Sequence, residues 1–179
     1  MVWTGEGTID YVMIGLCAVC LPINLLFLAM LIKYRDRSPL NSSFFHLCMH
    51  LTIADSIMML FSNLVFKFPM YGWFPAQILW DNKHGLLPKV PVVGVWYFSH
   101  AQAFGIIALA LNRFTASWWP IKHREFWWTQ SHMNIALLLQ WLLPIAIVAP
   151  MFFADFTLTS NNATGGILFV AESMDFHRV

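Results

Sequence analysis

The sequence predicts an all-α membrane protein with four transmembrane helices, and three observations carry that prediction. Of its 179 residues, 59% are hydrophobic and only 11% are charged, whereas about 25% of the residues in a soluble domain are charged. The chain contains four apolar runs of the length, about 20 residues, that a helix needs to cross the hydrocarbon core. These runs are continuous rather than alternating, which excludes the pattern of a membrane β-barrel.

The predicted spans share their length and a near absence of charge, and they cover about residues 11–32, 44–66, 92–117 and 133–153. The second span contains a single charged residue, Asp55, and the third is uncharged until Arg113. We therefore expect residues 11–154 to form a four-helix bundle. A short amino-terminal segment, 1–10, precedes it, and a tail, 155–179, follows it.

Basic residues beside the spans predict the orientation, because cytoplasmic loops carry an excess of lysine and arginine. The loops after the first and third spans hold five of the ten lysines and arginines: Lys33, Arg35, Arg37, Lys122 and Arg124. We expect a multi-pass protein of the plasma membrane with its amino terminus and its tail outside. Asn162, in that tail, begins a glycosylation motif, and the same motif at Asn41 falls in a predicted cytoplasmic loop and should stay unmodified.

Charge and motifs exclude several classes of function. The formal net charge of +1 is not that of a nucleic-acid-binding protein, which needs a concentrated basic face. The sequence has no glycine-rich phosphate loop, nucleophile elbow, pair of catalytic carboxylates or HExxH motif, so we expect neither an enzyme nor a cofactor. His46 and His50 are one helical turn apart, but no third ligand follows at a metal-binding spacing, and no metal site is predicted.

Asp55 predicts a polar cluster in the middle of the bundle. A carboxylate deep in a span costs several kcal/mol unless it has partners or water. Asn24 in the first span and Gln102 in the third lie within about two helical turns of the same depth. Two interpretations stay open: a cluster that holds a small cation or water and rearranges between two states, or a set of hydrogen bonds that only joins the helices.

The third span carries two further candidate sites. Arg113, at its inner end, could contact a cytoplasmic partner, or its side chain could simply reach the headgroup level. Trp96, Ser99 and His100, in the outer half, could line a ligand pocket open to the outside, or could serve ordinary interhelical packing. After Arg113, Trp118 and Trp119 predict an anchor at the membrane interface.

The order of these motifs resembles rhodopsin-like seven-helix receptors. Asn112-Arg113-Phe114, with Pro120 after it, is similar to their Asp-Arg-Tyr motif and second intracellular loop. Leu51-Thr52-Ile53-Ala54-Asp55 resembles their second-helix segment. The longer phrase LNRFTASWWPIKHREFW, residues 111–127, resembles the nematode serpentine chemoreceptors of the Srg superfamily, the Srg and Srv groups above all.

That resemblance implies a G-protein-coupled chemosensory receptor that senses an external small molecule. The chain would be its amino-terminal part, a fragment or truncated form with the first half of the seven-helix bundle. Asn112, Arg113, Phe114 and Pro120 would face a heterotrimeric G protein. Asn24, Asp55 and Gln102 would form the intramembrane switch, with Gln102 where such receptors build a sodium pocket.

One departure from the receptor pattern has a physical consequence. Asn112 stands where these receptors carry an aspartate, so the charge pair that restrains the neighbouring arginine cannot form, and we expect a looser resting state. Two other classes of protein stay open from the residues alone. One is a four-helix membrane scaffold that works by lateral association, and the other is a transporter or channel subunit built around Asp55.

Overall fold

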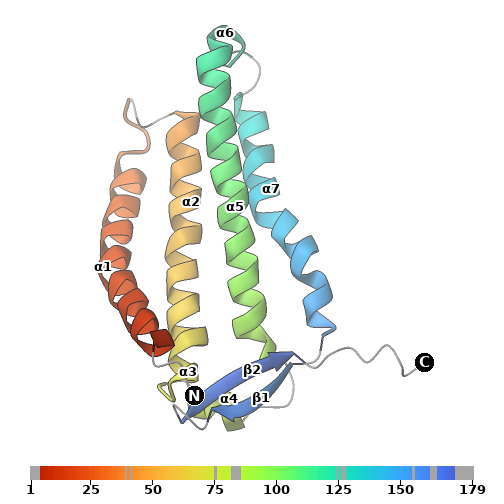
Figure 1. Ribbon diagram of the computed structural model, residues 1–179. Coiled ribbons are helices and arrows are strands. Elements are labelled where there is room, and N and C mark those ends of the chain that lie inside the picture. The colour runs from red at the N-terminus through yellow and green to blue at the C-terminus, as the bar shows by residue number, and fades with distance from the viewer. Residues whose placement is uncertain are drawn as a thin grey trace, which may run out of the picture.

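The computed structural model describes residues 5–38, 40, 42–74, 76–81, 86–123, 125, 128–154, 156–161 and 165–171. Within these residues, four helices are long and apolar enough to cross a membrane. They are α1 (Gly5–Tyr34), α2 (Ser43–Leu60), α5 (Lys89–Trp118) and α7 (Gln130–Val148). They stand side by side in that order, with α2 and α5 between α1 and α7 (Figure 1). The prediction of an all-α membrane protein with four transmembrane helices is confirmed.

Short helical segments extend two of the spans. α2 continues through a π-helical segment, η1 (Phe61–Lys67), into α3 (Phe68–Met70), and α7 continues into a 3-10 segment, η3 (Ala149–Phe152). The second span thereby reaches Ser43–Met70, beyond the predicted 44–66. α5 stops at Trp118, and a separate turn, α6 (Pro120–Lys122), begins at the proline, which cannot continue a helix freely.

Small and weakly polar side chains are among the most buried residues of α2 and α5. Ala54 and Ala101 are completely buried, and Thr52 and Ser56 are 5% exposed. In a bilayer the hydrophobic effect does not drive helices together, so close contact between small residues supplies much of the packing energy. Large apolar side chains instead cover the outside of the bundle, as at Leu26, which is 72% exposed.

The end of the bundle opposite α6 carries a β-hairpin that the sequence analysis did not predict (Figure 1). β1 (Phe156–Asn161) pairs antiparallel with β2 (Gly166–Ala171), and the hairpin lies across the bundle end beside α3 and α4 (Ala76–Asp81) (Figure 1). Its inner face joins a small apolar core with α4: Ala76, Leu79, Leu158 and Ile167. An isolated hairpin is marginally stable, so this packing explains why the strands form here.

Candidate functional site

The middle of the bundle holds the polar cluster around Asp55. Gln102 donates a hydrogen bond of 2.8 Å from Nε2 to Oδ1 of Asp55, which joins α5 to α2. Asn24 of α1 donates instead to Oγ of Ser56, at 3.3 Å. The structure therefore brings Asp55 and Gln102 into direct contact and places Asn24 against the neighbouring residue of α2.

α7 joins the same layer through residues that the sequence analysis did not select for it. Trp141 donates from Nε1 to Nδ1 of His50 at 3.2 Å, and the hydroxyl of Tyr97 donates to the backbone oxygen of Trp141 at 3.0 Å. A buried tryptophan N–H generally finds a hydrogen-bond partner. That rule is the signal in the sequence that could have indicated a polar contact at Trp141. Among the described residues, no group of three or more histidine, cysteine or acidic side chains could hold a metal ion.

Gln140 of α7 is an uncharged polar residue that is almost completely buried. Only 1% of it is exposed, and neither its amide oxygen nor its nitrogen has a hydrogen-bond partner among the residues that the structure describes. It lies against Gly105 of α5, where an added Cβ would come within 2.8 Å of the amide nitrogen. The signal in the sequence was one uncharged polar residue inside the apolar run Leu137–Leu143.

The carboxyl-terminal end of α5 holds the four predicted coupling residues in different environments. Asn112 is 3% exposed and donates from Nδ2 to Oγ of Ser43, at the start of α2, at 2.9 Å. Arg113 is exposed, and its guanidinium carbon lies 4.8 Å from the centre of the Phe44 ring. Phe114 stacks on Trp118 along the outer face of α5, and Pro120 is exposed at the start of α6. Asn112 thus holds two helices together, while the other three residues are accessible.

Thr115 connects this helix end to the loop that follows. Its Oγ1 accepts a hydrogen bond of 2.8 Å from Nε1 of Trp128 and lies 3.0 Å from Nδ1 of His123. Burial of the ring lowers the pKa of His123 below its ordinary value. The loop is therefore folded back onto α5 through a buried hydroxyl.

The predicted ligand residues on the outer half of α5 point in different directions. Trp96 is 52% exposed and stacks on His100, with ring centres 5.8 Å apart. Nδ1 of His100 lies 2.7 Å from the backbone oxygen of Trp96. Ser99 instead contacts the sulfur of Met58 on α2, at 3.8 Å. Trp96 and His100 form one exposed pair, and Ser99 is directed at α2.

A cavity of about 390 Å³ also lies between α4 and the hairpin. Its polar lining includes Gln77, Asp81 and Ser160, and Trp80 supplies an aromatic surface. The volume falls within the range of small-molecule pockets, about 300–1,000 Å³. Asn162, the predicted glycosylation site, lies outside the described residues.

Comparison with known proteins gives two matches. Residues 13–178 match a family model described as "Serpentine type 7TM GPCR chemoreceptor Srv". Serpentine receptor class V-1 of Caenorhabditis elegans is 46% identical to this chain over 171 residues, 96% of the chain. The match covers 54% of that relative, so the chain spans about half of the relative's length.

Proposed function

Because the chain belongs to the Srv family of serpentine chemoreceptors, we propose that it senses an external small molecule and couples to a heterotrimeric G protein. At the level of the family, the prediction of a serpentine chemoreceptor with multiple membrane spans is confirmed. Membership of the wider Srg superfamily and the assignment as the amino-terminal part of a longer receptor stay predictions. The family match disfavours the scaffold and the transporter.

The observation that carries this proposal is a pair of polar contacts between α2 and α5. One lies in the middle of the bundle and the other at the end that carries Arg113. Asp55 and Gln102 join the helices in mid-membrane, and Asn112 and Ser43 join them at the cytoplasmic end. α5 is one continuous helix between these points. A shift in the upper contact can therefore reach the lower one by movement of a rigid element between two packings.

Arg113 is the proposed contact for the G protein. Its guanidinium rests on the Phe44 ring, an interaction worth about 0.5–1 kcal/mol at an exposed site, and the neighbouring Asn112 offers it no negative charge. The amide of Asn112 is directed at Ser43. Both features support a resting state with appreciable basal coupling.

The positions of the basic loops predict which end of the bundle lies outside the cell, and this orientation is part of the proposal. An extracellular amino terminus places the hairpin, α4 and the outer half of α5 on the ligand side. Trp96, with His100 beside it, offers a stacked aromatic surface there, which supports a contact with ligand. Ser99, through Met58, links that region to α2.

The test is nucleotide exchange by a G protein in membranes that contain the protein expressed from its full transcript. Arg113→Ala should reduce exchange about tenfold or more, because one charge-assisted contact is worth about 1.5–3 kcal/mol. Lys122→Ala removes an exposed charge from the same end of the molecule and should change exchange little. Asn112→Asp should lower basal exchange by restoring the adjacent charge pair. Unchanged exchange in Arg113→Ala at equal surface expression would contradict the proposal.

A further inference from the structure

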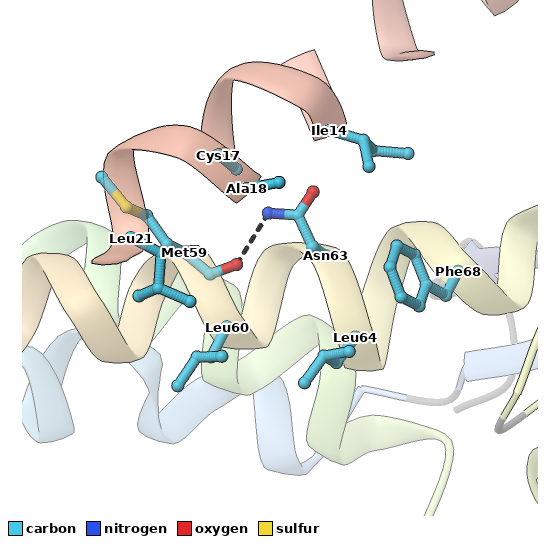
Figure 2. Close-up of a pocket in the computed structure, with 9 residues that line it drawn as sticks. All are labelled: Ile14, Cys17, Ala18, Leu21, Met59, Leu60, Asn63, Leu64 and Phe68. Carbon is cyan, nitrogen blue, oxygen red and sulfur yellow. Dashed lines mark hydrogen bonds between the residues drawn. The ribbon is translucent and has the colours of Figure 1, made fainter. Parts of the chain in front are cut away.

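A cavity opens between α1 and the second span, about one helical turn from the contact between Asn24 and Ser56. Its volume is about 140 Å³. Figure 2 shows its two walls, one formed by residues of α1 and the other by residues of α2, η1 and α3. Apart from Asn63 the lining is apolar, and it includes Ile14, Ala18, Leu21, Met59, Leu64 and Phe68.

The position of this cavity determines how a ligand would reach it. Both walls belong to segments apolar enough to cross the membrane, Tyr11–Tyr34 and Ser43–Met70. Leu60 and Leu64, which line it, are 39% and 45% exposed on the outer surface of the bundle. Among the described helices the opening therefore lies on the apolar outer surface, and a molecule that reaches it through the bilayer must be mostly apolar, because desolvating polar groups is costly.

Asn63 is the polar group on the cavity wall. Its Nδ2 donates to the backbone oxygen of Met59 at 2.7 Å, and in Figure 2 its amide oxygen points toward α1. That oxygen can accept a hydrogen bond from a molecule in the cavity. A buried hydrogen bond of this kind contributes about 0.5–1.5 kcal/mol net, so a ligand with one hydroxyl is favoured over the same shape without it.

The volume sets the size of the ligand. An apolar cavity of about 150 Å³ accommodates benzene, and drug-sized ligands need about 300–1,000 Å³. The cavity is therefore too small for a sterol. It matches a single aromatic ring or a short alkyl chain.

We propose that this cavity binds a small apolar alcohol of about the size of benzyl alcohol, which enters from the bilayer and donates its hydroxyl to Oδ1 of Asn63. The proposal rests on the receptor function above, for which it names a class of ligand. It places this site between α1 and the second span, separate from the contact proposed at Trp96 and His100.

The same wall of the cavity is mechanically connected to α5. Asn63 lies in η1, where its backbone oxygen accepts a hydrogen bond from the N–H of Phe68, five residues on. Such π-helical turns are rare and occur often at functional sites. On the other side of η1, Phe61 packs on Phe98 of α5 with ring centres 5.5 Å apart, and its ring fills the space above Gly94, where a Cβ would lie 2.2 Å away. A ligand pressing on η1 thus acts on α5, the helix that carries Arg113.

The experiment is photolabelling of the full-length protein in phosphatidylcholine nanodiscs with a diazirine derivative of benzyl alcohol, followed by mass spectrometry of the adducts. We expect adducts on residues 14–21 and 59–68. At equal concentrations in the membrane, benzyl alcohol should compete about three- to tenfold better than ethylbenzene, which has the same shape without the hydroxyl. Asn63→Leu should remove that difference.

Two alanines of α1 provide a matched pair of variants. Ala18→Phe fills the cavity and should abolish the adducts, whereas Ala29→Phe, at an exposed position of the same helix, should leave them. Adducts spread evenly over the lipid-facing helices, or retained in Ala18→Phe, would overturn the proposal, and so would equal competition by the two probes in the unsubstituted protein. The labelling needs no G protein, so its failure is distinguishable from failure of the nucleotide-exchange test.

Discussion

The buried side-chain amide of Gln140 has no hydrogen-bond partner among the residues that the structure describes. It is enclosed between α5 and α7, and the absence of a Cβ on Gly105 makes room for its amide. A buried amide without partners costs about 1–3 kcal/mol, and lipid offers no alternative donors. The residue therefore favours any rearrangement of the bundle that brings water or a polar side chain to it.

Gln140→Leu should stabilise the resting bundle, because leucine has a similar size and no polar atoms. We expect a gain of up to about 1–3 kcal/mol in the free energy of unfolding, measured as a higher melting temperature in a thiol-reactive dye assay on the protein's own cysteines. Gln130→Leu is the control, since Gln130 is exposed on the same helix and bonds to Asn134. A lower melting temperature in Gln140→Leu alone would mean that the amide is satisfied in the membrane, by an internal water for example.

Among the elements, the junction of α5 and α6 contains the group best placed to respond to pH, the ring of His123. Thr115 is 7% exposed, and its hydroxyl lies within hydrogen-bond distance of the side chains of both His123 and Trp128. These contacts hold the loop against Thr115, two residues after Arg113 in the chain, in the region proposed to meet the G protein. A change in the charge of His123 would therefore act directly on that surface.

Acidification should release this loop. Because burial lowers the pKa of His123 below its ordinary value of 6.5, the undocked loop takes up a proton at a higher pH than the docked loop does. The stability of the docked loop is then unaffected by this residue well above pH 6.5, and it decreases as the pH falls from 6.5 through the lowered pKa.

Nuclear magnetic resonance of protein labelled at histidine can measure this directly. The ring signal of His123 should titrate below pH 6.5, and the indole signal of Trp128 should shift over the same range as the loop undocks. His123→Gln should remove the pH dependence of the Trp128 signal. A ring that titrates at or above pH 6.5 would show that docking does not disfavour the protonated form.

At the scale of the whole molecule, the orientation in the membrane decides which end can meet a ligand. The hairpin and α4 lie at one end of the bundle and α6 at the other (Figure 1). The basic loops predict that the α6 end is cytoplasmic. Every proposed role for Arg113 depends on that orientation.

Two asparagines test the orientation without any knowledge of the ligand. In cells, Asn162→Gln should abolish a glycan that an endoglycosidase removes from the unsubstituted protein, seen as loss of the mobility shift on a gel. Asn41→Gln, at the same motif in the predicted cytoplasmic loop, should change nothing. A glycan that depends on Asn41 would falsify the proposed topology.

The sequence by itself determined the fold class and the approximate depth of the polar residues along the helices. Apolar runs of membrane-spanning length leave helices as the structure that satisfies every backbone group, and the rise per residue placed Gln102 within about two helical turns of the depth of Asp55. The order of motifs around Arg113 pointed to serpentine chemoreceptors, and the family match agrees. In each case the information is local in the chain.

The tertiary structure alone decided which polar groups meet. Depth along a helix does not specify rotation about its axis, so the bonds from Asn24 to Ser56 and from Asn112 to Ser43, and the isolation of Gln140, could not be predicted. The hairpin was missed because its short strands are stabilised by contact with α4, far away in the sequence. The cavity beside Asn63 has one wall from α1 and the other from the second span, so it is a property of the packed helices rather than of either segment.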